Sequence, residues 1–268
     1  MLKERVLTAI VLAAVLLGVM LGLPSVATVW LLTVLVLIGA WEWAGFIGKD
    51  TRATRVAFTV AVALALLACL HFYASNPEFV LAIVTIAVAW WFIAFLWLCL
   101  APGRVTPVTA TLAGFLSLVP CWLALVHVTF TTQSTRWVLF TLALVWAGDT
   151  GAFFVGRWLG RVPLAPRVSP KKTWEGALGG ILASGAVAWA SANWLFVVDA
   201  WPFVMTCVAV AALSIVGDLT ESMLKRAAGL KDSGTMFPGH GGMLDRIDSV
   251  TAAAPALVFA LIGLKVIA

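Results

Sequence analysis

Apolar runs of about 20 residues recur along almost the whole chain, and each is long enough to cross a hydrocarbon core about 30 Å thick as a helix. Hydrophobic residues make up 63% of the 268 residues and charged residues only 11%, whereas about a quarter of an ordinary soluble domain is charged. We therefore expect an all-α polytopic membrane protein with about nine transmembrane helices, at residues 6–23, 26–47, 56–73, 79–100, 108–130, 137–156, 175–198, 201–220 and 249–267.

The distribution of lysine and arginine predicts the orientation of these helices, because positively charged short loops stay on the cytoplasmic side of a membrane. With the N-terminus in the cytoplasm and the C-terminus outside, 15 of the 17 basic residues fall on the cytoplasmic side. Only Arg136 and Lys265 fall outside. An error of one helix would scatter this pattern, so the charges support nine spans.

Residues capable of chemistry are concentrated in the second half of the chain, from Asp149 onward. This predicts an N-terminal transmembrane scaffold at residues 1–136 and a C-terminal catalytic region at residues 137–268. The four cysteines lie inside apolar runs without CxxC spacing, which argues against zinc and disulfides. The chain has no basic stripe with interleaved aromatic residues, so nucleic acid is not an expected partner.

Asp149 stands inside the sixth predicted helix, in the sequence Gly148-Asp149-Thr150-Gly151. A carboxylate at that depth costs on the order of 3 kcal/mol, so it is expected to face a partner or a wet cavity. A substrate contact is one interpretation. A structural ion pair, or a carboxylate that reaches the membrane surface, is the alternative.

Ser169-Pro170 precedes the seventh predicted helix and is typical of an N-cap followed by proline at the first helical position. This places Lys171 and Lys172 in the first helical turn. Lysines there oppose the helix dipole, whereas a bound anion would be stabilised by both the lysines and the free N–H groups. The pattern predicts a phosphate-binding corner, with cytoplasmic lysines that serve topology alone as the alternative.

The end of the eighth predicted helix carries Asp218, Glu221, Ser222 and Lys225 at positions i, i+3, i+4 and i+7. These four residues share one helical face, which therefore combines possible metal ligands with a cation. Pairing between Glu221 and Lys225 at a solvated helix end would be the purely structural explanation. That explanation accounts least well for Asp218, the deepest of the four.

Polar and glycine-rich sequence connects the eighth and ninth predicted helices. It runs through Lys231-Asp232-Ser233-Gly234 to His240-Gly241-Gly242, and glycines of this kind let backbone N–H groups approach an anion. Asp245 and Asp248 follow at i, i+3 and would point the same way in a helix, as oxygen ligands suited to Mg²⁺. Acidic groups for a divalent metal beside basic and glycine N–H groups for phosphate indicate phosphoryl or nucleotidyl transfer.

The spacing of these residues resembles the signature of the phosphatidate cytidylyltransferase (CDP-diacylglycerol synthase) family. The matching positions are Ser222, Lys225, Arg226, Lys231, Asp232, Gly234, Phe237, Pro238, His240, Gly241, Gly242, Asp245, Arg246 and Asp248. The segments 148–152 and 169–175 also resemble family segments, so the resemblance covers roughly residues 140–268.

The resemblance implies that CTP and phosphatidate react to give CDP-diacylglycerol and pyrophosphate, with Mg²⁺ as cofactor and a monovalent cation such as K⁺ paired with it. It also implies a homodimer in a bacterial-type inner membrane with the active site facing the cytoplasm. By position, Asp218 and Asp245 match metal-holding aspartates, and Asp248 belongs to the same cluster. Another membrane phospho- or nucleotidyl transferase, or a cation transporter using Asp149 and Asp218, is the alternative.

The expected catalytic residues are therefore acidic metal ligands and their basic neighbours: Asp218, Asp245, Asp248, Lys225, Arg226 and Lys231. The expected substrate-binding residues flank them in the three polar segments: Asp149, Ser169, Lys171, Lys172, Ser222, Asp232, His240, Gly241, Gly242 and Arg246. No base is arranged to activate Ser222, so a covalent intermediate is not expected.

Overall fold

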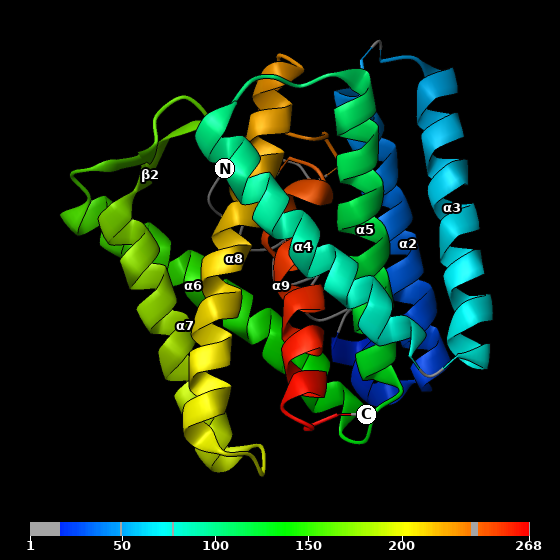
Figure 1. The fold of residues 1–268 in the computed structure, drawn as a ribbon, viewed down its shortest axis with the longest axis vertical. Helices are drawn as coiled ribbons and strands as arrows, with labels where there is room; N and C mark the ends of the chain where they lie inside the picture. Colours follow the sequence, from blue (N-terminus) through cyan, green and yellow to red (C-terminus); the bar gives the residue numbers. More distant parts are fainter. Residues whose placement is uncertain (1–16, 49, 77, 237–240, 268) are drawn as a thin grey trace.

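The computed structural model describes residues 17–48, 50–76, 78–236 and 241–267, which fold into a helical bundle with one small β-hairpin (Figure 1). In chain order the elements are α2 (Ser25–Trp43), the 3₁₀ helix η1 (Ala44–Phe46), α3 (Arg52–Ser75), α4 (Phe79–Leu100), α5 (Pro107–Thr129), α6 (Ser134–Leu159), β1 (Pro163–Ala165), β2 (Ser169–Thr173), α7 (Trp174–Trp194), α8 (Ala200–Ala227) and α9 (Leu244–Gly263).

Seven helices in the described part of the chain are long and apolar enough to cross a membrane, namely α2 with η1, α3, α4, α5, α6, α8 and α9. They correspond to seven of the predicted spans. The predicted span 175–198 forms α7, which is rich in glycine and alanine and is not among the seven. The predicted span 6–23 lies largely outside the described residues.

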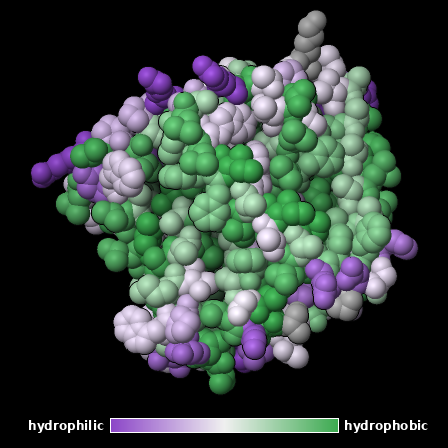
Figure 2. All heavy atoms as spheres, viewed as in Figure 1, coloured by the Kyte–Doolittle hydropathy of each residue, from purple (hydrophilic) through white to green (hydrophobic). Residues whose placement is uncertain are grey.

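The surface of the bundle has the pattern expected of a membrane protein. In the view of Figure 2, hydrophobic side chains cover the middle of the molecule, and hydrophilic side chains gather toward its two ends. Large apolar side chains such as Leu64 and Leu182 are exposed along the helices. Contiguous exposed apolar surface on this scale is the kind that lipid covers.

Helix α9 lies at the centre of the bundle and packs against α8, α5, α4, α6 and α2. Every residue from Ser249 to Val258 is buried, and most of them are small, which lets five helices approach one another around α9. Core residues from both sides of residue 136 belong to one continuous apolar cluster. The polar first turn of α9 is therefore held in place by packing from both halves of the chain.

The connection between α6 and α7 corrects two expectations. It forms an antiparallel β-hairpin of β1 and β2, so the fold is not purely helical. Lys171 and Lys172 lie in strand β2, not in the first turn of a helix. Two local effects explain the difference: a residue before proline favours extended backbone, and Thr173, not Ser169, is the N-cap whose hydroxyl accepts from Gly176 N at 3.1 Å.

Helices α6 and α7 approach closely because glycines face each other at their contact. A Cβ on Gly151 would lie 2.8 Å from the Gly179 carbonyl oxygen, and one on Gly180 would lie 2.7 Å from the Gly148 carbonyl oxygen. Small residues are what allow backbones to approach this closely in membranes. The close contact sets the position of Asp149, next to Gly148, relative to the hairpin that leads into α7.

We predict that Gly179→Ala destabilises the protein by about 1–3 kcal/mol through overpacking, because the added Cβ would lie 2.5 Å from Val155 Cβ. The measurement is the thermal unfolding midpoint in detergent, followed by tryptophan fluorescence. Gly185→Ala on the same helix is the control, since its nearest side-chain atom would be Val208 Cγ2 at an ordinary 3.5 Å. Equal midpoints for the two variants would contradict the close-contact interpretation.

Candidate active site

Residues of α6, α7, α8 and the β-hairpin line a cavity of about 460 Å³. These elements lie together on one side of the bundle (Figure 1). Five residues that the sequence predicted for the site line the cavity together: Asp149, Ser169, Lys171, Lys172 and Asp218. Much of the remaining wall is apolar or small, as at Phe153, Leu164, Ala211 and Ile215. A cavity with a charged end and an apolar wall suits an amphiphilic ligand.

Lys172 and Asp218 form an ion pair between β2 and α8. Their side chains are 29% and 23% exposed, so both remain accessible from the cavity. Ser222, one helical turn further along α8, lies with its Oγ 3.5 Å from Asp218 Oδ1. The hairpin therefore places Lys172 next to Asp218, the carboxylate on α8 that the sequence predicted for the site.

Asp149 on α6 and Asp248 on α9 complete an acidic group around this ion pair. Asp149 Oδ1 accepts a hydrogen bond from Ser249 Oγ at 3.3 Å, which ties α6 to the start of α9. Asp248 is close enough to Asp149, Asp218 and Glu221 for their charges to interact, with Lys172 as a neighbouring cation. Three helices thus bring carboxylates to one place, as expected for Asp218 and Asp248.

The predicted polar face of α8 is confirmed and continues into the protein interior. Lys225 Nζ lies 3.0 Å from Glu221 Oε1 and 2.6 Å from Asp245 Oδ1, and Glu221 and Lys225 are 2% and 8% exposed. Apart from Lys225, no donor among the described residues reaches the Glu221 oxygens. One ammonium therefore serves two carboxylates in a region where charge requires compensation.

Asp245, in the first turn of α9, binds both ends of the loop between α8 and α9. Its Oδ2 accepts hydrogen bonds from Ser233 N at 2.8 Å, from Gly242 N at 2.8 Å and from Ser233 Oγ at 2.9 Å. Its Oδ1 accepts from Lys225. Asp245 therefore already has four donors, whereas Asp218 and Asp248 face the acidic group near the cavity.

Glu42, on α2, is a residue of this region that the sequence reasoning missed. It is only 5% exposed and accepts hydrogen bonds from Ser233 Oγ, Met243 N and Leu244 N. The signal was a single carboxylate inside the otherwise apolar run 26–47, which should have a partner at that depth. Ser233 was missed as a separate contact because a serine in a polar loop is not distinctive.

The remaining predicted residues lie at the exposed ends of the α8–α9 loop or outside the described residues. Arg226, Lys231, Asp232 and Arg246 are exposed around the start and end of the α8–α9 loop. Gly241 has the positive φ of 77° that glycine adopts without strain, as the glycine-rich pattern predicted. His240 lies outside the described residues.

Oxygen ligands for a divalent cation are present, although among the described residues no group of three or more His, Cys, Asp or Glu side chains already has metal-binding geometry. The donor set around Asp149, Asp218 and Asp248 is entirely carboxylate, as Mg²⁺ prefers. Glu221 adds a further buried carboxyl group beside it, which is paired with Lys225. The residues present fit a hard cation that would balance this charge.

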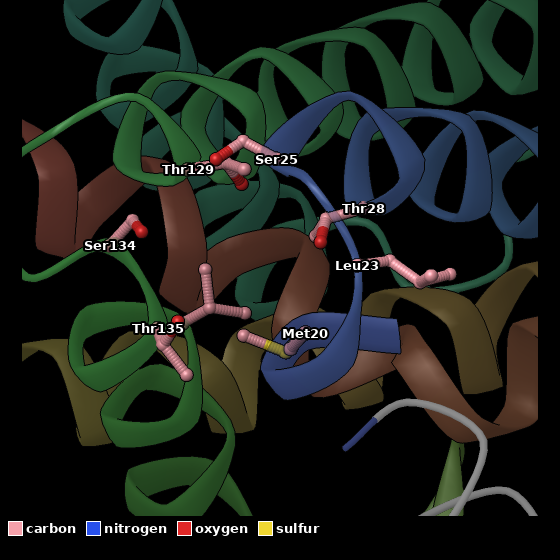
Figure 3. Close-up of a pocket in the computed structure, with 8 residues that line it drawn as sticks. Met20, Leu23, Ser25, Thr28, Thr129, Ser134 and Thr135 are labelled. Carbon is pink, nitrogen blue, oxygen red and sulfur yellow. The ribbon is translucent and has the colours of Figure 1, made fainter. Parts of the chain in front are cut away.

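A second hollow, of about 20 Å³, lies where α2 begins, α5 ends and α6 begins (Figure 3). Figure 3 shows Ser25, Thr28 and Thr129 around it, with Met20 at its base. It has room for about one water molecule, and none of its lining residues is acidic or basic. The large cavity is therefore the candidate active site.

Comparisons with known proteins give a consistent result. The model of the cytidylyltransferase family matches residues 3–263. The chain is 38% identical to the phosphatidate cytidylyltransferase of Pseudomonas aeruginosa over 265 residues, 95% of each chain. It is also 38% identical to the phosphatidate cytidylyltransferase of Haemophilus influenzae, in an alignment of 281 positions that covers 95% of this chain and 96% of the relative.

The phosphatidate cytidylyltransferase of Brucella suis is 45% identical over a shorter stretch of 120 residues, 45% of this chain and 44% of that protein. The match to the family model covers far more than half of the chain, and the first two relatives align over nearly their full length. Both findings agree with the resemblance seen in the motif residues. This chain belongs to the cytidylyltransferase family.

Proposed function

We propose that this protein transfers CMP from CTP to phosphatidate, giving CDP-diacylglycerol and pyrophosphate in phospholipid biosynthesis. The observation that carries the proposal is 38% identity, over at least 95% of both chains, to two proteins named phosphatidate cytidylyltransferase. The cavity supports it, because its charged end suits phosphates and its apolar wall suits the acyl part of a lipid.

The chemistry requires one oxygen of the phosphatidate phosphate to attack the α-phosphorus of CTP while the bond to pyrophosphate breaks. That oxygen is already anionic near neutral pH, so the protein has to supply position and charge compensation more than a strong base. Lys172 is suited to this task, because its Nζ is held at the cavity by Asp218 and can turn to a substrate phosphate.

The other basic residues differ in how exposed they are to the cavity and to solvent, and therefore in the roles that we propose for them. Lys171 and Ser169 line the same cavity as Lys172. Arg226, Lys231 and Arg246 stand at the exposed rim, where they can attract the triphosphate. Lys225 is buried between Glu221 and Asp245, so its role is to hold those carboxylates, and the Gly242 N–H is used by Asp245.

We further propose that Mg²⁺ binds at the acidic group, with Asp218 and Asp248 as ligands beside Asp149. Asp245 would become a further ligand if its Oδ1 gave up the contact with Lys225 and bound the ion instead. The cation would neutralise the phosphates that the reaction brings together. A paired monovalent cation such as K⁺ fits the same surplus of carboxylates.

For the membrane, we propose nine spans with the N-terminus in the cytoplasm, the C-terminus outside and the site at the cytoplasmic face of a bacterial inner membrane. Basic residues support this placement: Arg167, Lys171 and Lys172 lie in the hairpin, and Lys225, Arg226, Lys231 and Arg246 lie in the α8–α9 loop or in the helix ends beside it. We also propose a homodimer, which the resemblance implies and which cross-linking in native membranes would test.

The assay that tests the proposed reaction uses purified protein in detergent with labelled CTP, phosphatidate and divalent cation. We expect a labelled CDP-lipid and an equal amount of pyrophosphate. Omission of phosphatidate should leave CTP intact, because no covalent CMP-enzyme is expected. Absence of both products over a range of divalent ions would contradict the proposed CMP transfer.

The ion pair at the cavity gives a mutational prediction. Asp218→Asn and Lys172→Ala are each expected to lower kcat on the order of 100-fold or more, because the first removes a proposed metal ligand and the second removes a cation that would compensate the reacting phosphates. Asp199→Asn is the control, since Asp199 is an exposed carboxylate at the opposite end of α8. Near-normal rates for Asp218→Asn would remove Asp218 from the site.

Removal of divalent cations tests the metal proposal. We expect a chelator to abolish turnover and added Mg²⁺ to restore it, because the carboxylates at the site otherwise repel the substrate phosphates. In Asp248→Asn, half-maximal rate should require a higher Mg²⁺ concentration than in the wild type. A full rate in chelator would exclude the proposed ion.

A further inference from the structure

Glu42 connects the N-terminal half of the chain to the loop between α8 and α9. Its carboxylate accepts hydrogen bonds from Ser233 Oγ at 3.0 Å, from Met243 N at 3.1 Å and from Leu244 N at 2.8 Å. We infer that Glu42 is a positioning residue of the reaction, which holds the α8–α9 loop and the start of α9 in the arrangement that catalysis requires. This inference rests on the proposed function.

The contacts with Met243 N and Leu244 N explain why a carboxylate is needed at position 42. The N-terminus of α9 has no side-chain cap from its own N-cap residue, Met243. Helix N-termini leave N–H groups without partners and carry partial positive charge, which an anion compensates. Glu42 provides this cap from another helix, about 200 residues earlier in the chain.

The Ser233 hydroxyl links Glu42 to Asp245. Ser233 Oγ lies 3.0 Å from Glu42 Oε2 and 2.9 Å from Asp245 Oδ2, and it also accepts from Asp245 N at 3.3 Å. A serine hydroxyl has one proton, so it can donate to only one of the two carboxylates at a time. The position of Ser233, and with it the loop, therefore depends on both acids.

The surroundings of Glu42 are shaped to its carboxylate. A Cβ added to Gly234 or Gly242 would run into the Glu42 side chain, so both glycines leave room for it. The adjacent corner of the scaffold also touches the loop, because a Cβ on Gly45 would lie 3.8 Å from Leu230 Cδ1. The scaffold thus meets the loop at Ser233, Gly242 and Leu230.

Glutamine cannot replace glutamate at this position without loss. Glu42 uses Oε1 for Met243 N and Oε2 for Leu244 N and Ser233 Oγ. In Glu42→Gln, the amide NH₂ would face at least one N–H donor, and the charge that compensates the helix dipole would disappear. The side chain is nearly isosteric, so the substitution tests hydrogen bonding and charge with little change in packing.

The first measurement is hydrogen exchange of the purified protein without substrates, read by mass spectrometry. In Glu42→Gln we expect faster exchange confined to the amides of Ser233, Gly242, Met243 and Leu244, with α3 to α7 unchanged. Asp50→Asn is the matched control: Asp50 is an exposed partner of Arg55 near the same end of α2, at 2.6 Å, and its loss should leave this region unchanged.

The second measurement is turnover as a function of Mg²⁺ concentration. Glu42→Gln should lower kcat on the order of 10- to 100-fold, as expected for displaced reacting groups. It should also raise the Mg²⁺ concentration that gives half-maximal rate, because Asp245 and Asp248 are held less well. Loss of folded protein alone would lower the rate without moving that concentration.

Ser233→Ala gives an independent variant in case Glu42→Gln does not fold. It should show the same local exchange and the same direction of the Mg²⁺ shift, and the two substitutions together should cost less than the sum of their separate effects. Wild-type exchange and an unchanged Mg²⁺ dependence in these variants would overturn the inference, as would faster exchange throughout the protein. Inactive wild-type protein would instead sink the proposed function, while exchange would still report whether Glu42 orders the loop.

Discussion

The ion pair between Lys225 and Asp245 is the interaction on which the end of the bundle with the candidate site depends. Lys225 lies in the last turn of α8 and Asp245 in the first turn of α9, 2.6 Å apart. A cation at a helix C-terminus and an anion at a helix N-terminus each compensate the local dipole, so the pair joins two complementary ends. Because Asp245 also binds Ser233 and Gly242, the same carboxylate closes the loop between the two helices.

The surplus of negative charge at this end has a physical meaning for binding. Asp149, Asp218, Glu221 and Asp248 stand near one another, with Lys172 and Lys225 in contact with them and Arg246 close enough to Asp149 for their charges to interact. A protein folded for stability alone would gain little from such a group, because unpaired buried charge is costly. The proposed metal cation, bound together with the anionic substrates, would complete this balance.

The scaffold half of the chain takes part in building the site. Helix α2 reaches the start of α9 through Glu42, and the continuous core joins α2, α5 and α9. The division at residue 136 therefore describes where most chemistry-bearing residues occur in the sequence, while the arrangement of those residues depends on contacts across it. A loop that carries predicted site residues is positioned more precisely when it is attached to a helix of the scaffold.

Local sequence determined the helices, their approximate limits and several polar residues that the structure places around one cavity. Apolar runs of membrane-spanning length require helices whatever surrounds them, and the helical spacing of Glu221 and Lys225 was enough to place both on one face. The tertiary structure alone decided which polar groups meet. Lys172 reaches Asp218 because the connection folds as a hairpin, and Glu42 caps α9 across some 200 residues of chain, contacts that depend on how distant helices pack and that local periodicity does not encode.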